Sequence, residues 1–217
     1  TMEFNATVTS DGFCQVTQRM MLFLDAPVEK LTFPIPFNAR DIRVNGAAAS
    51  TVRDGNVLQV NLSRIIGGAA GSASVTLTYT LPNIVDDVNG TLTLALPMLC
   101  GFSCPVEEMT FTITLPGEIK GKPTFTSTYH QTLIASSMEL ELNGNLITGN
   151  SLKALKDHET LTMYLNTDPA LFPKAPLVFK ESGVDDTCMI VCGVLALLYW
   201  LIFLRAWPDF KTRSTTA

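Results

Sequence analysis

The sequence predicts an all-β ectodomain followed by one C-terminal transmembrane α-helix. Three observations lead to this fold class. Apolar and threonine residues alternate along much of the region 1–168, turn dipeptides separate these runs, and one uncharged apolar run lies near the carboxyl end. Many short strands joined by frequent turns are typical of an antiparallel β-sandwich, formed here as one unit or as two packed sub-sandwiches.

The alternating runs predict half-buried strands. In the segment SVTLTYT, Val75, Leu77 and Tyr79 face one way, and threonines occupy the other face. The β-branched threonine side chain suits the solvent face of a pleated sheet. The same pattern recurs in three further runs, at residues 91–96, 110–115 and 160–165.

Turn signals lie between these runs. Asp11-Gly12 predicts a first hairpin, and Asn45-Gly46 and Asp54-Gly55 bracket a short strand at 48–52, because these dipeptides readily adopt positive φ. We expect at most a helical turn or two at 151–159 and a loop at 65–72. Several prolines are expected at strand ends or edges, where a missing N–H does least harm: Pro34, Pro36, Pro82, Pro97, Pro105 and Pro116.

Residues 188–204 form an apolar run without a single charged side chain. A helix of this length spans about 26 Å, close to the roughly 30 Å of a bilayer's hydrocarbon core. We therefore predict a transmembrane helix over 187–207, rather than a buried core helix, which rarely stays apolar on every side for this length. Four residues are predicted to anchor it at the membrane interface: Tyr199, Trp200, Arg205 and Trp207.

Charge sets the expected orientation. The region after the span carries three basic residues and the region before it carries two within similar range, which favours a cytoplasmic C-terminus in the plasma membrane. The opening TMEFNATV shows no signal peptide, so either a signal was removed or the chain is tail-anchored and faces the cytosol. The predicted parts are a β-sandwich region (1–168), a proline-containing connector (169–186), the helix (187–207) and a basic tail (208–217).

Cysteines offer the sharpest candidate site. Cys100 and Cys104 lie close enough for a disulfide across a tight loop, and Cys14 is an alternative partner for either. Zinc held by these cysteines with His130 or His158 is a competing interpretation, although the spacing is not that of a zinc finger. Cys188 and Cys192 lie within the membrane run, where small apolar packing is the simpler explanation.

Other chemistry is weakly indicated. Acidic pairs at Asp86-Asp87, Glu107-Glu108 and Asp185-Asp186 are best explained as solvated, because neighbouring residues on a strand point to opposite sides. The chain contains no GxxxxGK[ST], GxGxxG, GxSxG or HExxH motif. No catalytic, cofactor-binding or metal-ligating residue is therefore assigned, and no cofactor is expected. With a net charge of −5 and no basic patch, nucleic acid is not expected as a partner.

Three function classes remain. The first is a non-enzymatic binding or assembly protein, with the lipid bilayer and an envelope protein as partners. The second is a subunit of a larger membrane complex, since Gly193 and Ala196 form a small-x-x-small helix face. The third is a membrane-anchored hydrolase or metal-dependent enzyme, which needs convergent polar side chains in a pocket. The sequence names no small-molecule ligand.

Three segments resemble the bacterial predicted-membrane-protein family called domain of unknown function 2207. They are TVTSDGFCQVTQRM, ITGNSLKALKDHETLTMYLNTDPALF, and a single span followed by WPDFKTRSTTA. The resemblance implies an extracytoplasmic β-rich domain behind a cleaved signal peptide, and then a transmembrane helix. Family members typically continue into a cytoplasmic region with further hydrophobic segments. The family's first strand often carries an acidic residue where this sequence has Gln18, and no catalytic residues are assigned to it.

Overall fold

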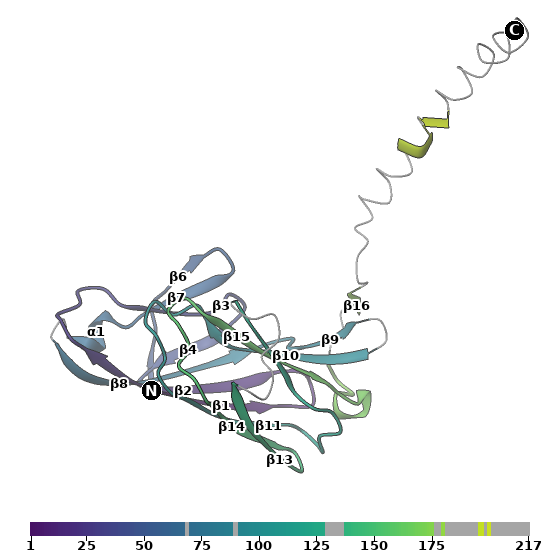
Figure 1. Ribbon diagram of the computed structural model, residues 1–217, viewed down its shortest axis with the longest axis horizontal. Helices are drawn as coiled ribbons and strands as arrows, with labels where there is room; N and C mark the ends of the chain where they lie inside the picture. Colours follow the sequence, from purple (N-terminus) through teal and green to yellow (C-terminus); the bar gives the residue numbers. More distant parts are fainter. Residues whose placement is uncertain are drawn as a thin grey trace, which may run out of the picture. The chain divides into compact units, whose positions relative to one another are not determined.

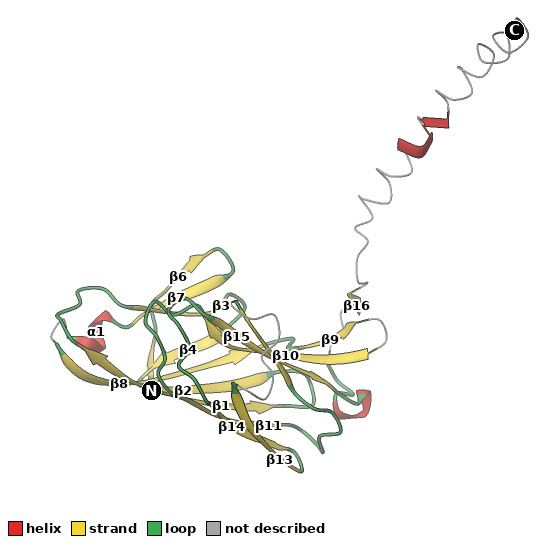
Figure 2. Ribbon diagram, viewed as in Figure 1, coloured by secondary structure: helices red, strands yellow, loops and turns green. Residues whose placement is uncertain are grey.

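A computed structural model describes residues 1–67, 70–88, 91–128, 137–175, 179–180, 195–197 and 199–200. The chain divides into two compact units, Thr1–Phe179 and Lys180–Ala217. The described part is mostly β-sheet, as Figure 2 shows, and this confirms the predicted β-rich class. The described helical segments of the first unit are the short α1 (Ser63–Ile66) and the 3-10 helix η1 (Pro169–Leu171).

The strands form three open sheets (Figure 1). The eight-stranded sheet has the order β13-β14-β11-β1-β2-β8-β4-β5, the five-stranded sheet β12-β15-β10-β9-β16, and the three-stranded sheet β3-β7-β6. Their bounds are β1 (Met2–Val8), β2 (Cys14–Leu24), β3 (Thr32–Pro36), β4 (Arg40–Val44), β5 (Ala47–Ala48), β6 (Thr51–Asp54), β7 (Val57–Asn61), β8 (Gly71–Leu81), β9 (Val85–Val88), β10 (Thr91–Cys100), β11 (Met109–Thr114), β12 (Thr124–Ser127), β13 (Met138–Asn143), β14 (Leu146–Ser151), β15 (Thr160–Asn166) and β16 (Phe179–Lys180).

One pairing in the large sheet is parallel. β1 runs antiparallel to β2 on one side, and on the other side it pairs in parallel with β11, from Met2 opposite Met109 to Thr7 opposite Thr114. The other pairs of this sheet with a described register are antiparallel. The chain therefore has to leave the sheet after β2 and return to the far side of β1 much later in the sequence.

The core lies between the sheets. Phe111 of β11 contacts Phe125 of β12 with ring centroids 5.7 Å apart, which joins the eight-stranded sheet to the five-stranded one. Phe33 of β3 lies against Phe102, just after β10, at 4.9 Å. Buried apolar residues from all three sheets belong to one continuous cluster, so hydrophobic burial holds them together.

The four threonine-rich runs are confirmed as β8, β10, β11 and β15. In β8 the apolar residues predicted to share a face are buried, and the threonines between them are partly exposed. The predicted turns are also confirmed. Gly12 (φ 79°) links β1 to β2, Gly46 (φ 81°) links β4 to β5, and Gly55 (φ 56°) lies between β6 and β7.

Two local predictions are wrong, and a third stays within its stated limit. The strand expected at 48–52 is two short strands, β5 and β6, which belong to different sheets. The segment 151–159, where at most a helical turn or two is expected, forms no helix, because Ser151 ends β14 and Leu155 bridges Val106. The expected loop at 65–72 contains the end of α1 and the start of β8, although residues 68–69 lie outside the described part.

Prolines follow the expected logic with one exception. Pro34 and Pro36 lie in β3, an edge strand. Pro97 instead lies within β10, where the register against β15 shifts between Pro97 and Leu99. This part of β10 lies beyond the residues that pair with β9, so the missing N–H of Pro97 removes no bond from that neighbour.

The membrane prediction falls largely outside the described residues. Of 187–207, the structure describes 195–197 and 199–200, which are helical and exposed, with Tyr199 and Trp200 among them. Arg205, Trp207 and the tail 208–217 lie outside the described part, as does much of the connector 169–186. Among described residues, no helix is long and apolar enough to span a bilayer, so the predicted span is not observed.

Candidate functional site

The solvent face of the eight-stranded sheet carries three rows of polar side chains, which we call the threonine face. Strand register and alternation place the members of each row side by side across neighbouring strands. The first row is Glu139, Asn150, Thr110, Glu3, Arg19 and Thr76; the second is Glu141, Thr148, Thr112, Asn5, Thr17, Thr78 and Arg43; the third is Asn143, Leu146, Thr114, Thr7, Gln15, Thr80 and Arg40. Leu146 is the single apolar member, so the face is polar from β13 to β4.

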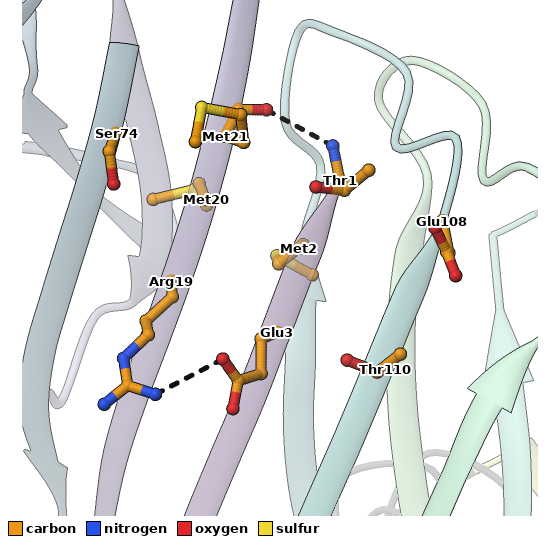
Figure 3. Close-up of a pocket in the computed structure, with 9 residues that line it drawn as sticks. All are labelled: Thr1, Met2, Glu3, Arg19, Met20, Met21, Ser74, Glu108 and Thr110. Carbon is orange, nitrogen blue, oxygen red and sulfur yellow. Dashed lines mark hydrogen bonds and ion pairs between the residues drawn. The ribbon is translucent and has the colours of Figure 1, made fainter.

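An ion pair lies at the centre of this face, shown in Figure 3. The Arg19 guanidinium lies 3.3 Å from the Glu3 carboxylate, and the Asn5 amide donates a hydrogen bond of 2.8 Å to the same carboxylate. The Asn5 hydrogen bond, followed by the charge and hydrogen bond of Arg19, lowers the pKa of Glu3. Both charged side chains are largely exposed, so this pair contributes little to stability.

The remaining charges of the face are segregated. Glu139 and Glu141 lie on β13 at one edge, and Arg40 and Arg43 lie on β4 near the other. Within the described part of the chain, none of these four forms an ion pair. The threonine face is therefore acidic at one edge and basic at the other, with Asp41 in the β4 bulge reducing the net charge of the basic edge.

Two shallow hollows mark the acidic half of the face. One, of about 280 Å³, lies around the Glu3–Arg19 pair and includes Met21, Ser74 and Thr110 (Figure 3). A second, of about 560 Å³, crosses β11, β14 and β13 and also reaches Thr110. Both are broad and shallow, and the lining of neither holds a base poised beside a nucleophile. A surface of this kind suits binding of an extended partner better than catalysis.

A third hollow has the opposite character. It has a volume of about 340 Å³ and lies between the end of β2 and the segment after β10. Its lining includes the buried side chains Met20, Leu22, Leu31, Phe33, Phe102 and Val106. The exposed residues Phe23 (67% exposed), Asp25 and Glu107 also line it. Most of its lining residues are therefore apolar, and two are acidic.

The candidate disulfide is not formed. Cys14, Cys100 and Cys104 are all free thiols, so the disulfide predicted among them is absent from the structure. Burial raises the pKa of Cys14 to about 12 and that of Cys100 to about 12. Both thiols are therefore protonated at neutral pH and poor nucleophiles. Cys104 is partly exposed and lines the apolar pocket.

The metal alternative gains no support from the arrangement. No group of three or more His, Cys, Asp or Glu residues able to hold a metal occurs among the residues described here. His158 lies in a turn with φ 57°, is exposed, and its backbone N–H donates to the Phe102 carbonyl at 2.7 Å. It is thus a solvated turn residue. His130 lies outside the described residues.

The acidic pairs are dispersed. Asp86 and Asp87 lie on β9, opposite Thr93 and Leu92, and neighbours on a strand point to opposite sides. Glu107 and Glu108 precede β11, and both are exposed. Asp185 and Asp186 lie outside the described part of the chain. Glu107 and Glu108 therefore match the predicted solvated role, whereas Asp86 and Asp87 are half-buried within a strand.

The most unusual polar residue of the core, Gln18, was not singled out as a core residue from the sequence. It is 1% exposed and lies on the core face of β2. Its Nε2 donates a hydrogen bond of 2.9 Å to the Met98 carbonyl of β10, which links two sheets. Its Oε1 accepts no hydrogen bond from any described atom. The alternation of apolar and polar residues in β2 places position 18 on the apolar face, and this pattern could have identified Gln18 as a core residue.

No family model matches the sequence, and no curated protein matches it. The structure of native leukotriene A4 hydrolase from Saccharomyces cerevisiae is similar with a TM-score of 0.43 and 10% identity, over 75% of this chain and 28% of that one. An M1 zinc metallopeptidase from Deinococcus radiodurans has a TM-score of 0.37 and 11% identity, over 75% of this chain and 40% of that one. Each of those chains thus has a large region without a counterpart here.

Proposed function

We propose that this chain is a non-enzymatic binding or assembly protein of the bacterial envelope. Its β-sandwich region, 1–168, which is antiparallel apart from the β1–β11 pair, is extracytoplasmic and is held at the plasma membrane by a single helix at 187–207, with the C-terminus in the cytoplasm. The resemblance to the family called domain of unknown function 2207 supports the same plan. In this proposal the partners are the lipid bilayer and another protein at the membrane.

The observation that carries the binding role is the threonine face. It presents three ordered rows of side chains across seven strands, and these rows hold no pair of groups arranged for proton transfer. Cys14 and Cys100 are held protonated by burial, which argues against a nucleophilic role for either of them. The uncharged run at 188–204 supports the anchor.

Topology is tested with a thiol reagent that does not cross membranes. In a Cys104→Ser background, Asp54→Cys places a thiol at the exposed end of β6, and Thr215→Cys places one in the tail. The reagent is added to cells whose outer barrier has been removed and whose plasma membrane is intact. We expect labelling at position 54 only, and labelling at position 215 only after the cells are lysed. The reverse pattern would overturn the proposed orientation.

The non-enzymatic role is tested on the purified full chain in detergent. Peptides, esters and cell-wall glycans serve as substrates, and no turnover is expected above the background of a mock purification. Turnover that a single substitution abolishes would contradict the proposal, because a contaminant's activity would not respond to a change in this chain.

A further inference from the structure

We propose that the threonine face is a homodimer interface, on which a second copy of this chain packs face to face about a twofold axis parallel to the strands. The inference rests on the proposed membrane-anchored binding role and names its partner. The threonine face is solvent-exposed in the described structure, and the segregated charges at its edges indicate what covers it.

Charge fixes the symmetry of the pair. A twofold axis lying between two facing sheets can run along the strands or across them. Along the strands, it exchanges the two edges and keeps each row in place, so that Glu141 of one copy lies over Arg43 of the other, with Glu139 and Arg40 one row to either side of this contact. Across the strands, it sets acidic edge over acidic edge. Unlike charges attract and like charges repel at these distances, so the first arrangement is favoured.

The side chains of the face suit packing against themselves. Threonine is the most frequent residue of the rows, and each hydroxyl both donates and accepts hydrogen bonds, so an identical surface can supply the missing group. Threonine is also short, which lets two sheets approach to the usual separation of about 10 Å. The central Glu3–Arg19 pair is already neutralised within one copy and brings no unpaired charge into the contact.

The size of the face is sufficient. Seven strands about 4.8 Å apart and three rows about 6.6 Å apart give roughly 650 Å² per copy, or about 1,300 Å² in total. This lies at the lower end of stable interfaces, which extend upward from about 1,200 Å² of buried surface. The face lacks a central aromatic anchor, so association in free solution should be weak.

The proposed anchor strengthens the contact. Rotation about an axis preserves the position along it, so Phe179, where the first unit ends, lies at the same height in both copies. One bilayer can therefore hold both copies when the axis is normal to the membrane. Confinement to the same membrane raises the effective concentration of the second copy without new contacts.

Charge reversal on the full chain in detergent micelles provides the test, with native mass spectrometry and sedimentation as readouts. Wild type should be partly dimeric at low salt and less so at high salt, because exposed ion pairs are screened. Glu139→Lys/Glu141→Lys and Arg40→Glu/Arg43→Glu should each be monomeric. An equimolar mixture of the two variants should recover the dimer, because each reversed edge then faces an edge of opposite charge.

A control variant, Glu29→Lys/Asp54→Lys, makes the same change in net charge as the acidic-edge reversal, at exposed positions outside the eight-stranded sheet, and should dimerise like wild type. A wild-type chain that is monomeric at all concentrations overturns the inference. Charge-reversed variants that remain dimeric also overturn it, because the contact would then lie elsewhere, for example on the membrane helix. In either case the labelling and turnover experiments above decide the proposed function independently.

Position along the axis gives a second check. Exchange of the edges sets the middle strand of the face, β1, over its own copy, so Asn5 lies beside its symmetry mate. Sheets about 10 Å apart are too distant for a direct disulfide, so a short bismaleimide reagent should instead link Asn5→Cys between the two copies. Lys153→Cys, exposed after β14, should not exceed the background of the parent chain. Equal cross-linking at both positions would exclude this geometry.

Discussion

At the residue scale, Gln18 holds two sheets together at a cost. Its Nε2 satisfies the Met98 carbonyl, yet its Oε1 is buried without a described partner, and an unsatisfied buried polar atom costs about 1–3 kcal/mol. The hydrogen bond of Gln18 thus fixes the position of β2 relative to β10 more than it stabilises the fold. The sequence alone could not predict that this glutamine is important. A single glutamine among apolar residues of one face could equally mean that the alternation of buried and exposed positions had been assigned one residue out of step.

Two substitutions separate these effects. Gln18→Met removes the unpaired oxygen but leaves the Met98 carbonyl unpaired, so we expect the free energy of unfolding to change by less than about 1 kcal/mol. Gln18→Ala also opens a cavity and should lower it by about 2–4 kcal/mol. Urea unfolding followed by far-ultraviolet circular dichroism measures both. Equal losses would show that the hydrogen bond, rather than packing, dominates.

Alkaline pH should weaken the fold through Cys14. Its folded pKa is raised to about 12 by burial, above its value in the unfolded chain, about 8.5. Between these values the unfolded chain binds fewer protons, so the free energy of unfolding is fully retained below about pH 8 and falls as pH rises toward about 12. The limiting slope is about 1.4 kcal/mol per pH unit.

Urea midpoints measured from about pH 7 to about pH 10 test this thiol. Cys14→Ala should show a shallower decline than wild type across that range, although it is less stable at neutral pH because it shortens a buried side chain. Parallel declines for the two proteins would mean that Cys14 does not carry the alkaline effect. Burial raises the pKa of Cys100 to about 12 as well, so Cys100 should add a comparable decline that remains in Cys14→Ala.

At the scale of elements, Gly149 decides how β14 fits between β11 and β13. A Cβ placed there would overlap the Glu139 carbonyl oxygen and lie 2.6 Å from Cζ of Phe111. A strand with any other residue would have to move away from one neighbour. The close approach of backbone and ring is a case in which glycine is required for space rather than for a turn.

Gly149→Ala should therefore lower the free energy of unfolding by about 1–3 kcal/mol through overpacking. The neighbouring Thr148→Ala, on the solvent face, should change it by less than about 0.5 kcal/mol. Chemical denaturation of both variants checks the contrast. A neutral Gly149→Ala would mean that β13 shifts freely and that the edge of the threonine face is not fixed.

Local patterns explain why some elements could be predicted and others could not. Alternation and positive-φ dipeptides depend on neighbouring residues, and they located β8, β10, β11, β15 and the hairpins. Pairing partners depend on the whole chain. Nothing near residues 48–52 shows that its two halves join different sheets, and nothing in β1 shows that its second neighbour is β11. The threonine face could not be predicted for the same reason, because its rows can be identified only when the register between the strands is known.

At the scale of the whole molecule, the first unit should be self-sufficient. The buried core extends from Met2 to Phe172, and the unit ends at Phe179. A chain ending at Phe179 should show the far-ultraviolet circular dichroism spectrum of a folded β domain. It should unfold at the same urea midpoint as the full chain within experimental error. A loss of cooperative unfolding on truncation would show that residues beyond 179 belong to the fold.

The parallel β1–β11 pair has a consequence for biogenesis. Met2 pairs with Met109, which leaves the ribosome far later. The edge of β1 that will pair with β11 therefore stays unpaired while much of the chain is synthesised. Contacts so distant along the chain form slowly, and an open strand flank can recruit the wrong neighbour meanwhile. Production of this protein should thus depend on a chaperone that shields β1 until β11 arrives.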